Sequence, residues 1–180
     1  APERFELAFG LPPDPQRDAR STSEPAKVDG RFLLRGSIDL VERKPRTKIV
    51  RVTDHKTGRN RTNLATIVDG GKVLQPVLYG LALESLSDDI VEEGRLSYCT
   101  TAGRFSKHPI PLDVLTRRRG LEVLEIIDRA IARGTLAARP ARDACTHCDF
   151  TAVCGPDEEY RTLRKPAGLL ADLDELRKMP

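Results

Sequence analysis

Three charged side chains in the sequence could do chemistry, because two acids and a lysine lie in neighbouring apolar stretches. Asp39 lies in the stretch GSIDLV, and Asp54 and Lys56 lie in the stretch IVRVTDHK. Successive side chains of a strand point to opposite faces, so Asp54 and Lys56 share the face of Val50 and Val52. Charges on such an apolar face are costly unless they are paired or bind something.

A strand pair would bring Asp39 beside Asp54, where the two carboxylates repel each other. A hard divalent cation with oxygen ligands removes this repulsion. Lys56 would then lie beside the cation, where it could orient a water molecule or stabilise charge that develops on a phosphate. The residues alone leave a second interpretation open, in which the same side chains form a cross-strand salt bridge on a solvated face.

The elements that must position these residues follow from hydrophobic periodicity and from turn residues. An irregular loop rich in Pro, Asp, Ser and Arg is expected over 11–29, and Pro76 requires its helix to begin nearby. Together the elements predict an α/β fold with a small mixed central sheet flanked by helices. The expected strands are 5–9, 32–41, 49–56 and 94–101, and the expected helices are 72–86, 113–131, 158–165 and 169–178.

Three motifs occur in the same order as in a known family. They are GSID ending at Asp39, VTDHKTG around Asp54 and Lys56, and LQPVLY from Leu74 to Tyr79. These segments resemble the G-x-x-D, D-x-K-[TS]-G and Q-x-x-x-Y motifs of the PD-(D/E)xK nuclease superfamily in its RecB-like branch. The resemblance covers about residues 30–155 and implies a restriction-endonuclease-like core.

The resemblance also implies roles for individual residues. Asp39 and Asp54 would bind Mg²⁺ or Mn²⁺ together with the backbone carbonyl of His55, and Lys56 would be the catalytic lysine. Gln75 and Tyr79, which are one helical turn apart, would position the lysine, a water molecule or the phosphate. The His55 side chain is expected on the opposite face of the strand. Relatives also carry an upstream helix with a metal-site histidine, which this sequence lacks, so we expect a fragment with weak nuclease activity or none.

Three cysteines within ten residues predict metal ligation rather than disulfides. Cys145, Cys148 and Cys154 resemble the C-terminal part of the iron–sulfur staple of AddB-type nucleases, and imply a [4Fe-4S] cluster in the full-length parent that is incomplete here. Zinc is the alternative, with His147 or Cys99 as the fourth ligand. The position of Cys99 within an expected strand favours a buried thiol.

The composition is that of a water-soluble domain with an ordinary core. The chain has 180 residues, a net charge of +3 and 39% hydrophobic residues, without a long apolar stretch or a signal peptide. Basic residues cluster at 43–48, at Arg59 and Arg61, and at 117–119, which suits contacts to DNA phosphates. We expect a cytoplasmic protein without a membrane segment, divided into an N-terminal strand and loop (1–29), a nuclease core (30–139) and a cysteine-bearing extension (140–180).

These features predict a metal-dependent deoxyribonuclease, of the exonuclease kind, from a helicase–nuclease or RecB-family protein of DNA repair and recombination. Its partners would be DNA and a helicase domain or partner subunit. Two alternatives remain. In one, the nuclease-like fold is a DNA-binding or scaffolding module without catalysis; in the other, it is a zinc- or cluster-binding interaction module in which Asp54 and Lys56 form a simple ion pair.

Overall fold

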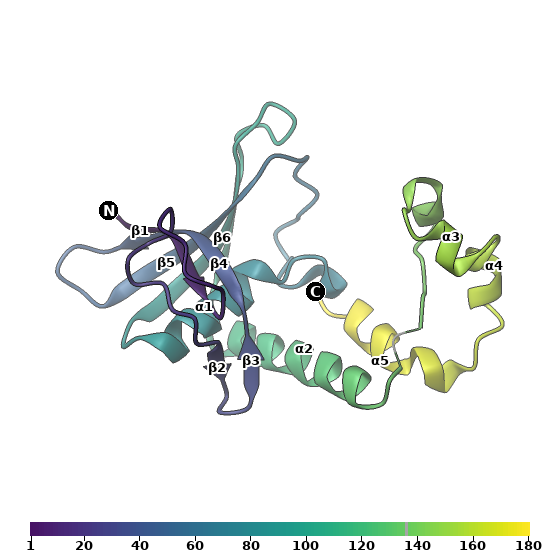
Figure 1. The fold of residues 1–180 in the computed structure, drawn as a ribbon. Coiled ribbons are helices and arrows are strands. Elements are labelled where there is room, and N and C mark those ends of the chain that lie inside the picture. The colour runs from purple at the N-terminus through teal and green to yellow at the C-terminus, as the bar shows by residue number, and fades with distance from the viewer. Residues whose placement is uncertain (136) are drawn as a thin grey trace. The chain divides into compact units, whose positions relative to one another are not determined.

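The computed structural model describes residues 1–135 and 137–180, which form a mixed α/β fold around a five-stranded sheet (Figure 1). The strand order is β1-β4-β5-β6-β7; the β5–β6 pair is parallel and the other three pairs are antiparallel. This confirms the α/β class with a small mixed central sheet. The strands of this sheet are β1 (Pro2–Phe9), β4 (Gly36–Arg43), β5 (Ile49–Lys56), β6 (Ile90–Tyr98) and β7 (Lys107–Pro111), and a separate hairpin consists of β2 (Ala26–Val28) and β3 (Phe32–Leu34).

The chain divides into two compact units. The first contains Ala1–Glu122 and Met179–Pro180, and the second contains Val123–Lys178. All the strands lie in the first unit. The helices are α1 (Gln75–Leu86), α2 (Val114–Ala132), α3 (Thr151–Cys154), α4 (Glu158–Thr162) and α5 (Ala167–Arg177), with short 3-10 turns at Asp69–Gly71 and Ala144–His147.

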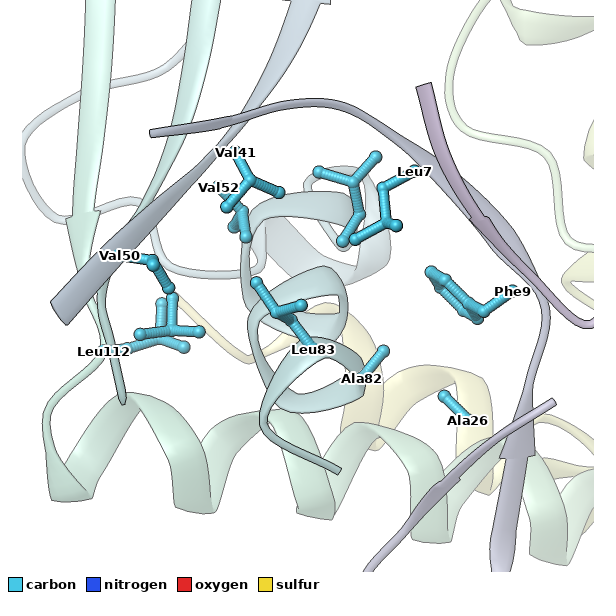
Figure 2. Packing of buried hydrophobic residues seen from close by; sticks show 11 residues of the cluster. Leu7, Phe9, Ala26, Val41, Val50, Val52, Ala82, Leu83 and Leu112 are labelled. Atoms are coloured by element: carbon cyan, nitrogen blue, oxygen red, sulfur yellow. The ribbon is translucent and has the colours of Figure 1, made fainter. Parts of the chain in front are cut away.

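The hydrophobic core of the first unit lies between one face of the sheet and α1. Val41 of β4 is directly opposite Val52 of β5, and both side chains are fully buried. Figure 2 shows these valines, with Val50, directed toward Ala82 and Leu83 of α1. The period of two along β5 therefore places one face of the strand under the helix, as the sequence predicts.

The strands differ from the sequence-based expectation in three places. The stretch 32–41 is broken at Arg35, so that its first part pairs with β2 and its second part joins the main sheet. Strand β6 begins at Ile90, before the expected position, and β7 was not expected at all. Because β7 pairs with β6 alone in this sheet, it is an edge strand, where Pro109 and Pro111 are tolerated.

The second unit is helical. Arg129 of α2 donates hydrogen bonds to Asp172 and Glu175 of α5, both at 2.6 Å, and Leu170 is buried. Over the described parts of both units, no helix combines the length and the apolar character needed to cross a membrane.

Candidate active site

The end of the β4–β5 pairing brings Asp39 and Asp54 to neighbouring positions. Leu40 pairs with Thr53, and the next residues in the same register are Asp39 and Asp54. On its other side β5 runs parallel to β6, where Asp54 is opposite Leu96. The negative charge of Asp39 contributes to the pKa of Asp54, so the two carboxylates are close enough to interact.

Asp54 is buried and has the ammonium of Lys56 as its ion-pair partner. Its Oδ2 atom lies 2.7 Å from the Lys56 Nζ atom. Burial raises the pKa of the Asp54 carboxyl, and the charge of Asp39 adds to this effect, while Lys56 opposes it. Each carboxylate oxygen has two lone pairs, so Asp54 can bind a cation while it stays in contact with Lys56.

Lys56 is held from two sides. Its Nζ atom lies 2.7 Å from Asp54 and donates a second contact of 2.7 Å to Oε1 of Gln75, the first residue of α1. The helix start can approach β6 because residue 94 is glycine: a Cβ there would lie 2.2 Å from the carbonyl oxygen of Pro76. Pro76 lies at the beginning of α1, where its missing N–H costs nothing.

Asp39 reaches the backbone of β5. Its Oδ2 atom accepts a hydrogen bond of 2.6 Å from the backbone N–H of His55, and Nδ1 of the His55 ring lies 3.5 Å from the same oxygen. The β5–β6 ladder continues through His55 and Lys56, and along it Asp54 is buried while His55 is exposed.

Tyr79 lies near the same carboxylates. Burial raises the pKa of its hydroxyl, the charge of Asp54 raises it further, and a hydrogen bond with Gln75 opposes both. The ring packs edge-on against Phe9, with centroids 6.2 Å apart and an interplanar angle of 87°. Gly36 makes room for both rings, since a Cβ there would lie 3.1 Å from Cε1 of Tyr79 and 3.3 Å from Phe9. This gives a packing reason for the glycine of the GSID motif.

Glu6 is a neighbour of the site that sequence reasoning missed. Its backbone is left-handed, with φ of 51°, in the middle of β1, and its carboxylate accepts a hydrogen bond of 3.2 Å from Ser37. Its charge also contributes to the raised pKa of Tyr79. Glutamate in a strand gives no signal of a left-handed conformation, so the sequence offered no means of finding it.

The residues present fit a divalent cation of the magnesium type. Within residues 1–135 and 137–180, no group of three or more His, Cys, Asp or Glu side chains is placed to hold a metal. A cation at this site would thus rest on the carboxylates of Asp39 and Asp54, with backbone and water oxygens as its other ligands. Mg²⁺ is bound in this way, because it keeps several waters and uses one or two carboxylates.

The cysteine segment forms a different feature, in the second unit. Cys145, Cys148 and Cys154 line one cavity of about 430 Å³, and burial with nearby negative charge raises the pKa of the Cys145 thiol. As placed, the three sulfurs are not a metal-binding group among the described residues. Cys99 is exposed just after β6, so the expectation of a buried thiol was wrong: the strand ends one residue earlier, at Tyr98.

Comparison with known proteins agrees with the site and the fold. The sequence profile of the PD-(D/E)XK nuclease superfamily matches residues 1–155, a span that includes Asp39, Asp54 and Lys56. A comparison with curated proteins finds no match to this chain. Members of this superfamily are usually metal-dependent nucleases, and the five-stranded mixed sheet flanked by helices is consistent with their restriction-endonuclease-like fold. The chain therefore belongs to the PD-(D/E)XK nuclease superfamily.

Proposed function

We propose that this chain is a deoxyribonuclease domain of the RecB-like branch that hydrolyses DNA phosphodiesters with Mg²⁺ or Mn²⁺. We further propose that it acts as an exonuclease beside a helicase domain or partner subunit in DNA repair or recombination. The observation that carries the nuclease proposal is the buried Asp54 carboxylate, which lies next to Asp39 and 2.7 Å from a lysine that Gln75 holds in place.

In this proposal the residues divide the work of hydrolysis. A divalent cation held by Asp39, Asp54 and the His55 carbonyl would supply a positive charge that polarises the phosphate and lowers the pKa of water. The Lys56 ammonium orients the attacking water and stabilises the additional negative charge on the phosphate oxygens. The water oxygen bonds to phosphorus, the bond to the leaving sugar oxygen breaks, and that oxygen takes up a proton. Gln75 fixes Lys56, and Tyr79 borders the same space.

The proposal is tested by cleavage of labelled DNA with the protein in excess, so that slow turnover is detected. We expect Mn²⁺- or Mg²⁺-dependent cleavage that Asp54→Asn and Lys56→Ala each reduce by at least about 100-fold, because each variant removes an electrostatic contact made in the transition state. Matched controls are Asp88→Asn and Lys48→Ala, which alter an exposed ion pair elsewhere in the first unit. They should cleave at the wild-type rate.

Two results would contradict the proposal. Near wild-type cleavage by Asp54→Asn or Lys56→Ala would place the chemistry elsewhere. Metal-independent DNA binding without detectable cleavage, at every metal concentration, would favour the non-catalytic DNA-binding or scaffolding module.

We also propose that Cys145, Cys148 and Cys154 are ligands of a structural iron–sulfur cluster in the assembled protein. Their shared cavity supports this, and Cys99 is not among the described residues that line it. A [4Fe-4S] cluster has four ligands, so we expect this chain, purified without oxygen, to show no cluster absorption in the visible range. A brown protein with about four irons per chain would show that another group completes the site.

A further inference from the structure

Two loops that follow β5 and β6 contain arginine and no acidic residue. The first, residues 57–68, follows β5 and contains Arg59 and Arg61 without any Asp or Glu. The second, residues 99–106, joins β6 to β7; it contains Arg104, is followed by Lys107, and also has no acid. We call the two loops, together with Lys107, the basic rim.

Several positive charges elsewhere in the first unit are neutralised by the protein itself. Arg43 forms an ion pair of 2.8 Å with Asp89, and Arg117 forms one of 2.6 Å with Glu84. By contrast, within the described residues no carboxylate pairs with the four cations of the rim, which are all exposed: Arg59, Arg61, Arg104 and Lys107. Charges of this kind are free to bind phosphates.

The two loops are joined to each other directly beside Lys56. The backbone N–H of Cys99 donates to the carbonyl of Lys56 at 2.9 Å, and the Thr100 hydroxyl donates to the carbonyl of Thr57 at 2.9 Å. Farther out, Nδ2 of Asn60 donates to the Ser106 hydroxyl at 3.0 Å. Figure 1 shows both loops extending together beyond the same end of the sheet. Both loops therefore begin beside Lys56, so DNA held by them would lie next to the candidate site.

The second loop presents an aromatic ring on a well-fixed turn. Phe105 is 65% exposed and follows Arg104, and both residues have left-handed backbones, with φ of 48° and 56°. Two hydrogen bonds hold this turn: Arg104 N–H to the Thr101 carbonyl at 3.0 Å, and Phe105 N–H to the Thr100 carbonyl at 3.1 Å. A left-handed backbone at two consecutive non-glycine residues is uncommon and is a recognised mark of functional positions.

We propose that the basic rim binds unpaired DNA, with Phe105 stacked on a nucleobase and the four cations on the phosphates to either side. The inference rests on the proposed nuclease function and names the substrate class of that site: a single strand, or the frayed end of a duplex. Unpaired bases expose their faces to an aromatic ring, whereas the bases of an intact duplex are already stacked on each other. Positive charges that follow a strand, together with one stacking ring, are the features that single-strand recognition needs.

The inference is tested by the affinity of the full chain for a fluorescent 20-nucleotide oligo-dT and for a blunt 20-base-pair duplex, both measured in EDTA. We expect Phe105→Ala to weaken oligo-dT binding by about tenfold and duplex binding by less than about twofold, because one stacked base is lost. Phe105→Trp should retain the affinity. Arg104→Ala should weaken the binding of both ligands. It should also reduce the slope of log affinity against log salt concentration by about one, because one phosphate contact is lost. The matched control is Phe5→Ala, which removes an equally exposed ring from β1.

Three results would overturn the inference. In the first, Phe105→Ala weakens binding of oligo-dT and of the duplex equally. In the second, Phe105→Ala leaves the affinity for oligo-dT unchanged. In the third, the wild-type protein binds the duplex more tightly than oligo-dT. Far-UV circular dichroism of each variant shows whether it is folded, and Phe105→Trp keeps the test valid if the alanine variant unfolds. Because binding is measured without metal, the result is independent of cleavage: a protein that cleaves nothing but loses oligo-dT affinity with Phe105→Ala would contradict the nuclease and support the rim.

Discussion

Replacing Asp54 by asparagine separates a catalytic carboxylate from a structural one. The substitution keeps the volume of the side chain and removes its charge. If Asp54 serves mainly as the ion-pair partner of Lys56, the loss of a buried partner costs about 3–5 kcal/mol of unfolding free energy. If the Asp54 carboxylate instead serves to bind a cation, then in the absence of metal the variant should be as stable as the wild type or more stable.

The structure favours the second result. Asp54 is buried, and burial raises its pKa, so folding makes the charged form less favourable than it is in water. A buried charge has a desolvation cost, and asparagine removes the charge. Lys56 is one-third exposed and keeps its contact with Gln75, so it is not left without a partner. We therefore expect a gain of about 0–2 kcal/mol, as is common when a functional charge is removed.

The assay is urea unfolding followed by far-UV circular dichroism at pH 7, since the chain has no tryptophan. It is performed in EDTA and again with MgCl₂. In EDTA the variant should match or exceed the wild type. With Mg²⁺ at about ten times its Kd, the wild type alone should gain about 1.4 kcal/mol. A loss of more than about 2 kcal/mol of unfolding free energy by Asp54→Asn in EDTA would show instead that the residue is a structural ion-pair partner of Lys56.

Further predictions concern packing and pH. Gly94→Ala should destabilise the protein by about 3 kcal/mol, measured by urea unfolding, because its Cβ would meet the Pro76 carbonyl at 2.2 Å. Gly36→Ala should cost about 1 kcal/mol and slow DNA cleavage, because it displaces the Tyr79 ring; cleavage at the wild-type rate would argue against a role for this tyrosine. Burial raises the pKa of Glu42, but a hydrogen bond from Arg51 and the charge of Arg95 hold it below its ordinary value of 4.5. The charged Glu42 side chain thus contributes its full stabilisation above about pH 4.5 and loses it as the pH falls further. In Glu42→Gln, the free energy of unfolding should therefore fall less between neutral and acid pH than it does in the wild type.

The sequence predicted the centre of the fold well, because local patterns determine it. The alternation of Val50, Val52 and Asp54 gave the bounds of β5, and Pro76 correctly implied a helix that begins beside it. The motifs also placed Lys56 and Gln75 in one site, and the structure brings them within 2.7 Å of each other.

The remainder depended on contacts between distant segments, which local patterns do not encode. The left-handed backbone of Glu6 lies within the β1–β4 pair, and the hydrogen bond from the His55 N–H to Asp39 joins β5 to β4. Charge clusters were misleading in the same way. The arginines at 117 and 119 suggested a DNA surface, but Glu84 and Glu122 neutralise them.

The position of Mn²⁺ in a crystal of this protein, located by anomalous scattering, decides whether Asp39 and Asp54 form a metal centre. We expect a peak within about 2.0–2.3 Å of carboxylate oxygens of both residues, with the Lys56 ammonium beside it. The same peak should be absent from Asp54→Asn. Manganese bound elsewhere in the wild type, with the two carboxylates left as they are, would contradict the claim that these acids form the metal centre of a nuclease.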